Sequence, residues 1–199
     1  MTLISIETRD GDVRNQISGS LLKSSPKPDF FFKDATVLER ERKLYALVVN
    51  LCRSMAADIA EEKMTSQPAT GMNHPAWILG HLAVTTDSAV RIVGGTPVCP
   101  EDWRVKFGPG STVIADRGAY PSKSELLAAF EAAHARVMEG MASVTEEHLS
   151  RPQPSRFFRA ELPTLGDMLL HLITTHPMLH LGQLSAWRRA MGLPGVIRV

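Results

Sequence analysis

Residues 164–194 read TLGDMLLHLITTHPMLHLGQLSAWRRAMGLP, and this stretch decides the fold. Its apolar residues and two histidines recur at spacings of three and four, which is typical of one face of a helix with about 3.6 residues per turn. The residues on this face are Leu165, Leu169, Leu172, Ile173, His176, Leu179, His180, Leu184 and Trp187. Thr164 and Asp167 are spaced as in a capping box, and Gly192 followed by Pro194 is typical of a helix end. The stretch therefore predicts one long amphipathic helix.

Two histidines of this face, His176 and His180, are four residues apart and lie one turn apart on the same side of the helix. A histidine on an apolar face is most often a core residue that is hydrogen-bonded to a neighbour, and this interpretation stays open. The alternative is a metal site, because a third inward-facing histidine, His81, lies in another predicted helix. Three imidazoles leave a fourth position free, as in catalytic zinc sites. Imidazole also binds nickel, copper and iron, so the sequence alone does not select the metal.

Three further amphipathic helices are predicted upstream. The first covers 34–62, where Leu38, Tyr45, Cys52 and Ile59 repeat every seven residues. The second covers 73–93, with Asn73 as its N-cap and with Ile78, His81, Leu82, Thr85, Ala89 and Ile92 on its apolar face. The third begins at Ser122, which forms a capping box with Glu125, and carries Leu126, Leu127, Phe130, Ala133, Val137, Met138 and Met141. Together with 164–194, these segments predict an all-α fold, a four-helix bundle.

The segments outside these helices have their own predicted roles. Residues 94–120 are rich in glycine and proline and are predicted to be a long crossover, a lid, or both, anchored by Trp103 and Phe107. Residues 1–33 are predicted to be a partly disordered N-terminal arm, and the triplet Phe30–Phe32 near its end is expected to pack on the bundle. The chain is thus divided into this arm and one bundle domain, 34–199.

Composition narrows the possible classes of protein. The 199 residues are 44% hydrophobic and 22% charged, as in an ordinary globular protein. The formal net charge of +1 gives no electrostatic reason to expect nucleic acid or an acidic membrane as a partner. No apolar run is long enough to cross a bilayer, and the N-terminus lacks the pattern of a secretory signal. The only cysteines, Cys52 and Cys99, form no metal or redox motif, which predicts a cytoplasmic protein with reduced thiols.

The other four histidines are predicted to stay outside the metal site. His171 is five residues before the pair, and at about 100° per residue it points away from their shared face. His74 is seven residues before the third candidate ligand and could line the mouth of the site. His134 lies beside the third apolar face and is predicted to be structural, whereas His148 is predicted to be solvated in a polar linker.

The residues between the paired histidines bear on the geometry and on the chemistry. Pro177 removes a backbone hydrogen bond inside the predicted helix. In one interpretation, a kink at this proline sets the orientation of the two imidazoles. In the other, the proline is simply accommodated, or the helix begins later than predicted. Both interpretations stay open. Met178 and Leu179 follow, so the pair is not an HExxH motif and a zinc protease with a glutamate base is not expected. No carboxylate lies at motif spacing beside the histidines, which argues against a hydrolase.

Residues of the second and last predicted helices form two motifs. They are Asn73, His74, Trp77, His81 and Leu82 in the second helix, and His176, His180, Gly182, Gln183, Trp187, Arg188, Arg189, Gly192 and Pro194 in the last. In this order and separation they resemble the DinB-like superfamily, over 34–194. The resemblance implies a four-helix bundle with a long crossover, commonly a homodimer, and a divalent metal ion, often zinc or nickel, held by His81, His176 and His180. It also implies thiol-dependent transfers with glutathione, mycothiol or bacillithiol, or maleylpyruvate isomerisation, although many members have no assigned activity.

Three hypotheses about function follow. The first is a metal-dependent enzyme that acts on a small molecule by thiol-dependent S-transferase or isomerase chemistry, in a pocket shaped by Trp77, Thr85 and residues 94–120. The second is a non-enzymatic stress protein that binds a metal or a small ligand. The third is a structural bundle whose histidines bind no metal. We also expect a homodimer, by analogy and because the 34–62 helix and Phe30–Phe32 offer more apolar surface than four helices need.

Overall fold

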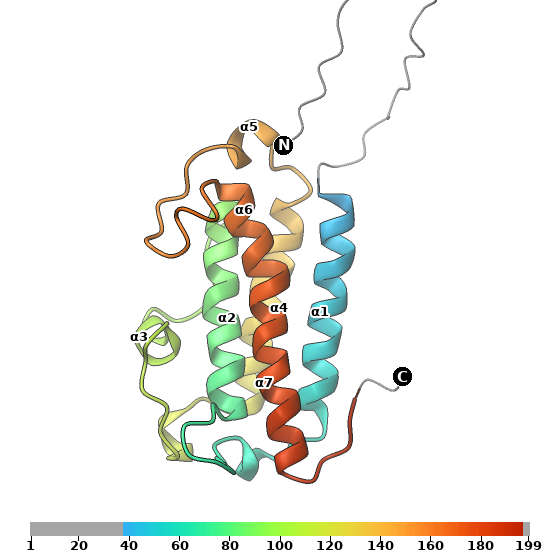
Figure 1. Ribbon diagram of the computed structural model, residues 1–199, viewed down its shortest axis with the longest axis vertical. Coiled ribbons are helices and arrows are strands. Elements are labelled where there is room, and N and C mark those ends of the chain that lie inside the picture. Colours follow the sequence, from blue (N-terminus) through green and yellow to red (C-terminus); the bar gives the residue numbers. More distant parts are fainter. Residues whose placement is uncertain (1–37, 197–199) are drawn as a thin grey trace, which may run out of the picture. The chain divides into compact units, whose positions relative to one another are not determined.

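The computed structural model describes residues 38–196, so the predicted arm 1–33 with Phe30–Phe32 lies outside the described residues. Four long helical segments are present: α1 (Glu39–Ala57), α2 (Pro75–Ile92), α4 (Lys123–Gly140), and a last segment of α6 (Leu165–Leu170), the π-helical turn η3 (His171–Thr175) and α7 (His176–Ala190) (Figure 1). The short elements are η1 (Glu61–Lys63), α3 (Trp103–Phe107), η2 (Arg117–Ala119) and α5 (Glu146–Leu149). Residues 38–196 contain no β-strand, which confirms the all-α prediction.

The helix directions explain the long crossover. α2 and α4 run parallel, because Val93 after the end of α2 lies against Gly140 at the end of α4. The start of α4 lies near the far end of α1, where the Lys123 backbone N–H donates to the Glu61 carboxylate at 3.1 Å. A connection between parallel neighbours has to return along the length of a helix, which takes many residues. The 94–120 segment does this, and Trp103 and Phe107 are its buried anchors, as predicted.

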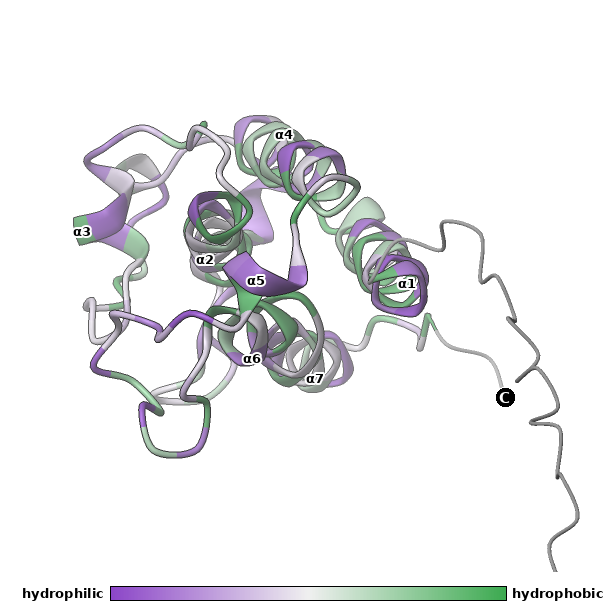
Figure 2. Cartoon of the chain, turned by 90° about the horizontal axis from the view of Figure 1, so that it is seen from above, coloured by the Kyte–Doolittle hydropathy of each residue, from purple (hydrophilic) through white to green (hydrophobic). Residues whose placement is uncertain are grey.

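α2 is the central helix. It packs against α4, α3, α6 and α7, and the view along the bundle shows it between them (Figure 2). Of its 18 residues, 15 are buried, which is typical of a helix that lies inside a domain and not on its surface. The heptad residues predicted for the first helix are also buried: Leu38, Tyr45, Cys52 and Ile59. No helix in the described part of the chain is both long and apolar enough to cross a membrane.

Two predicted helix boundaries are wrong. The first helix ends at Ala57 and not near residue 62; Ala60 is extended, and η1 follows. Lys123 caps this end, because its Nζ donates to the carbonyls of Ala57 and Ile59. The N-cap of α2 is His74 and not Asn73, because Pro75 takes the first helical position.

His134 has the structural position that its pattern predicts, and it makes the fold sensitive to acid. Its ring packs edge-on against Tyr45 with centroids 4.6 Å apart, and its Nδ1 is buried without a hydrogen-bond partner among the described residues. Burial, and after it the charge of Arg53, lowers the pKa of His134 to about 4. Between about pH 6.5 and 4 the unfolded chain therefore binds a proton that the folded chain does not, so the free energy of unfolding falls as the pH falls through this window.

We expect His134→Leu to remove this contribution. The variant should gain stability relative to the wild type as the pH falls from about 7 to about 4.5, because leucine fills the site without a group that titrates. Urea unfolding of both proteins at the two pH values measures the difference. A difference that is the same at both values would show that His134 contributes nothing to the acid sensitivity.

Candidate metal centre

Three histidines from two antiparallel helices meet inside the bundle. His81 comes from α2, and His176 and His180 come from the first turns of α7. One nitrogen of each ring lies within 4.8 Å of the others, and the Nε2 atoms of His81 and His176 are 3.2 Å apart. His81 and His180 are buried, and His176 is half-buried. The structure thus brings together the three residues that the sequence singles out.

The contacts of His81 leave its Nε2 without a proton and facing the Nε2 of His176. Its Nδ1 lies 2.6 Å from the carbonyl oxygen of Phe107, which can only accept, so Nδ1 carries the proton and donates it. The ring stacks on Trp77 with centroids 4.6 Å apart and planes 10° apart. A neutral ring that is protonated at Nδ1 presents its lone pair at Nε2. Metal-binding histidines are commonly oriented by such a second hydrogen bond.

His180 is held in the same way by Gln183. The Nδ1 of His180 donates to Oε1 of Gln183 at 3.1 Å, and the same oxygen accepts from Nδ2 of Asn73 at 3.1 Å. Because the Asn73 amide is a donor, it fixes the oxygen of Gln183 on the side of the histidine. The neutral His180 ring therefore also has its lone pair at Nε2. Asn73 and Gln183 both belong to the sequence motifs, and orienting this ring is the role that the structure shows for them.

Burial keeps the three rings neutral near pH 7. It is the main cause that lowers the pKa of His81 to about 4 and the pKa of His176 to about 3. Burial also lowers the pKa of His180, and the hydrogen bond to Gln183 opposes this effect. Neutral imidazole is the form that binds metal ions, so the cluster does not have to lose protons before it can bind one.

The spacing and chemistry of the cluster fit a divalent transition metal. Nitrogens that each lie about 2.0–2.1 Å from a tetrahedral zinc ion are about 3.3 Å from one another. The 3.2 Å between the Nε2 atoms of His81 and His176 matches this value. The Nδ1 of His176 is buried and has no hydrogen-bond partner within residues 38–196, whereas its Nε2 faces the Nε2 of His81. Three imidazoles suit zinc, nickel, copper or iron, whereas magnesium and calcium prefer oxygen ligands.

The helix that carries the histidine pair is not a continuous α-helix. In the π-helical turn η3 the backbone N–H of His176 donates to the carbonyl of His171, five residues earlier. The turn is followed by His176 and then by Pro177, which has no N–H and lies in the first turn of α7. Pro177 is therefore accommodated at a new helix start and not in the middle of an unbroken helix.

The same turn overturns the prediction that the His171 side chain points away from the paired histidines. Regular α-helical rotation separates residues that are five apart, but a π turn brings them close together. The rings of His171 and His176 are 5.6 Å apart between centroids. The Nδ1 of His171 lies 2.8 Å from the Thr175 hydroxyl, and the ring meets Phe158 edge-on at 5.2 Å. His171 thus lines the same cavity as the three clustered histidines, although it is not part of the cluster itself.

The cluster opens into a cavity of about 990 Å³. This volume is at the upper end of the range for small-molecule sites. The walls come from α2, the crossover, the loop between α5 and α6, and the last helix; they include Val84, Thr85, Pro109, Met168, Leu172 and Leu179. Thr85 and part of 94–120 therefore shape the cavity as expected. Trp77 stacks on the ring of His81 and does not line the cavity.

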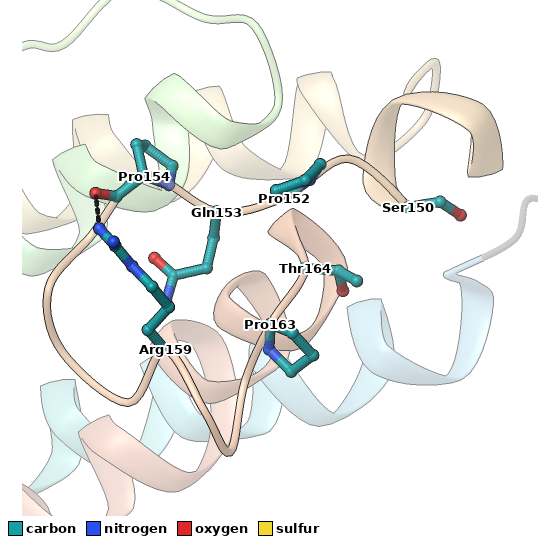
Figure 3. Close-up of a pocket in the computed structure, with 7 residues that line it drawn as sticks. All are labelled: Ser150, Pro152, Gln153, Pro154, Arg159, Pro163 and Thr164. Carbon is teal, nitrogen blue, oxygen red and sulfur yellow. Dashed lines mark hydrogen bonds between the residues drawn. The ribbon is translucent and has the colours of Figure 1, made fainter.

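The loop between α5 and α6 forms one wall of this cavity, and the buried Gln153, drawn in Figure 3, holds the shape of the loop. The Gln153 backbone N–H donates to the Pro163 carbonyl at 3.0 Å, and its Nε2 donates to the Phe157 carbonyl at 3.0 Å. Arg159 donates to the Pro154 carbonyl at 3.0 Å across a smaller hollow of about 570 Å³. Phe158, directly before Arg159, has φ of 51°, which is uncommon for a residue other than glycine. The network thus fixes a strained aromatic residue at the edge of the cavity.

Two further histidines differ from their predictions. His148 is not simply solvated: it lies in α5, its Nε2 donates to the Ile92 carbonyl at 2.7 Å, and it lines the cavity. His74 does not line the mouth. It is fully buried, its Nδ1 accepts from the Trp77 backbone N–H at 3.1 Å, and its Nε2 donates to the Ile114 carbonyl at 2.9 Å.

The α2 motif has one shared role, which is to hold the crossover. The side chains of His74, Trp77 and His81 bond to three successive points of it, at residues 114, 111 and 107. At spacings of three and four they lie along one face of α2. The motif therefore positions both a histidine of the cluster and the segment that covers it.

Comparison with known proteins gives a family. The sequence profile of the DinB superfamily matches residues 44–184. The fold is similar to the crystal structure of a conserved protein from Enterococcus faecalis, with a TM-score of 0.61, 19% identity, and coverage of 80% of this chain and 99% of that chain. No curated protein matches this sequence. Since the profile spans most of the chain and all three clustered histidines, this protein belongs to the DinB superfamily.

Proposed function

We propose that this protein binds a divalent metal ion, zinc or nickel, through His81, His176 and His180, and that it is a metal-dependent enzyme acting on a small molecule. The observation that carries the proposal is the convergence of three neutral imidazoles, two of them oriented by bonds from Nδ1 to fixed oxygens, at a large cavity. Structural metal sites usually have four protein ligands, whereas three leave a position for water or substrate.

The chemistry that we propose is thiol-dependent S-transfer or isomerisation. An ion held by three neutral imidazoles would supply Lewis acidity that favours the ionised form of a thiol. The residues that line the cavity include no aspartate or glutamate. A hydrolytic reaction that depends on a carboxylate base therefore has no support from the described residues. A volume of about 990 Å³ is large enough for a thiol and a second small reactant.

The proposal is tested by reconstituting the protein with zinc or nickel and screening thiols together with electrophilic partners. Consumption of the thiol that depends on the metal and is lost in His180→Ala would support the enzyme. Elemental analysis that finds no metal after reconstitution would contradict the metal site itself, and would leave a structural bundle.

A non-enzymatic protein that binds a metal or a small ligand is the second candidate. The absence of a carboxylate from the cavity lining favours it, because the described residues offer no carboxylate as a general base. Stoichiometric metal binding with no turnover across the thiol screen would support this candidate over the enzyme.

We also propose a homodimer in the cytoplasm. Leu44 and Leu47 on the outer side of α1 are 54% and 55% exposed, and such apolar side chains are suited to a subunit interface. A monomer in light scattering at micromolar concentration would contradict the dimer.

Gln183→Leu should weaken metal binding by about 10- to 100-fold, the usual effect of losing a hydrogen-bond partner of a metal ligand. Without the amide oxygen, the Nδ1 of His180 loses its acceptor, and the ring can turn or change tautomer. Gln183→Glu keeps an oxygen at this position and is the matched control. Competition with a coloured chelator measures both variants. Equal affinity of the leucine variant and the wild type would show that Gln183 does not orient the ligand.

A further inference from the structure

Three arginines from different segments line the cavity. Arg91 lies near the end of α2, Arg104 in α3 of the crossover, and Arg151 in the loop after α5. All three residues are exposed, whereas His81 and His180 are buried. The arginines therefore stand at the mouth of the cavity and the histidines at its inner end.

The three arginines at this mouth are not paired with carboxylates of the described residues. None of the three arginines forms an ion pair with a carboxylate among residues 38–196. Asp87, one turn before Arg91, is directed elsewhere, because its two oxygens accept from the backbone N–H groups of Val98 and Cys99, each at 2.9 Å. Burial lowers the pKa of Arg91, the positive charge of Arg104 adds to this effect, and the negative charge of Asp87 opposes it. A hollow lined by charge of one sign concentrates ligands of the opposite sign.

The wall between the arginines and the histidines is mostly apolar. It is formed by Val84, Leu165, Met168 and Leu172, and the exposed Phe157 and Phe158 lie at its outer edge. The cavity thus has a cationic mouth, an apolar middle and an imidazole cluster at its inner end. A ligand that satisfies all three parts has an anionic group, an apolar body and a group that binds the metal.

We propose that Arg91, Arg104 and Arg151 bind the carboxylate or phosphate of a small organic anion whose other end reaches the three histidines. This proposal rests on the proposed function and adds the class of ligand. Guanidinium groups suit the task, because their planar set of N–H donors matches both carboxylate and phosphate. Because arginines recognise carboxylates and phosphates in the same way, the structure does not distinguish the two kinds of anion. The experiment therefore tests one pair of thiols for each kind.

The test measures binding of paired thiols to the zinc-loaded protein by calorimetry. Glutathione is compared with its diethyl ester for carboxylates, and coenzyme A is compared with pantetheine for phosphates. In the wild type, the anionic member of at least one pair should bind about tenfold more tightly. Each of Arg91→Gln, Arg104→Gln and Arg151→Gln should reduce this ratio by about two- to fivefold, the range for an exposed ion pair, and the triple variant should bring it close to one. Arg40→Gln, an exposed arginine of α1 that does not line the cavity, should leave the ratio unchanged.

Two outcomes overturn the proposal. The first is that both members of each pair bind equally well to the wild type, or that neither binds. The second is that the affinity ratio between the anionic and the neutral member stays the same in the triple variant while its circular dichroism spectrum is native. Failure of the proposed function gives a different result. S-methylglutathione keeps the carboxylates and blocks the thiol. If it binds as tightly as glutathione and the arginine variants weaken both, the arginine site stands and the role of the thiol at the metal is wrong.

Discussion

His180→Ala is expected to abolish stoichiometric metal binding and to lower the affinity for zinc or nickel by more than about 100-fold. The buried imidazole is one of three proposed ligands, and its loss should exceed the 10- to 100-fold effect of losing an outer hydrogen-bond partner. Elemental analysis after dialysis and competition with a chelator measure the two quantities. Retention of one ion per chain would place the metal elsewhere.

His171→Ala is the matched control, because it removes another imidazole of the same helix and cavity. Its ring lies beside His176 but outside the group of three converging nitrogens, and its Nδ1 is paired with the Thr175 hydroxyl. The variant should therefore keep one ion per chain. Loss of the ion in both variants would show that four histidines bind it and that the site is closed.

Thermal unfolding gives a second measurement on the same proteins. An ion that binds only the folded chain raises the free energy of unfolding by mass action. A chelator should therefore lower the Tm of the wild type and of His171→Ala, and it should change His180→Ala little. The bundle should survive in each case, since its core of apolar side chains is formed by the helices themselves. Complete unfolding of the wild type by the chelator would contradict this description of the site.

Gly80→Ala is expected to lower the free energy of unfolding by about 1–3 kcal/mol, the cost of overpacking a filled core. A Cβ atom on Gly80 would fall within the ring of Phe107, which is fully buried. The backbone carbonyl of Phe107 also accepts the hydrogen bond from the Nδ1 of His81. If the alanine displaces Phe107 and with it α3, metal binding should weaken as well. An ordinary core substitution would lower the stability without changing the affinity for the metal.

Gly182→Ala is the control, because Gly182 lies in α7 with open space where its Cβ would be. Alanine is the better helix former, so this variant should gain about 0.5–1 kcal/mol. Chemical unfolding measures both variants, and adding Phe107→Leu to Gly80→Ala should recover part of the loss. An unchanged free energy of unfolding in Gly80→Ala would show that the crossover can move away from α2 at little cost.

Much of the fold could be predicted because it depends on local patterns. The capping boxes at Ser122 and Thr164 form as their spacing predicts. The apolar faces are buried because any amphipathic helix hides that face. The end of α1 could not be predicted, since it is set by Lys123 from α4, which is distant in sequence.

The site could be predicted only in part, for the same reason. His176 and His180 follow from a four-residue spacing within one α-helix, and His81 from its place on an apolar face. The position of His171 beside the cavity could not be predicted, because the regular rotation of an α-helix does not hold where the chain forms a π turn. The arginines at the mouth come from three segments that no periodic pattern relates, so only the tertiary structure brings them together.

The π turn adds one residue to the last helical segment compared with a continuous α-helix. Deleting one of its residues, for example Thr174, would restore α-helical geometry and rotate everything before it by about 100° relative to α7. His176 and His180 would keep their places, while His171 would leave the cavity and Met168 and Leu169 would leave their buried positions. In this chain the one extra residue of the π turn therefore lets a single helical segment carry the paired histidines and also build the cavity wall beside them.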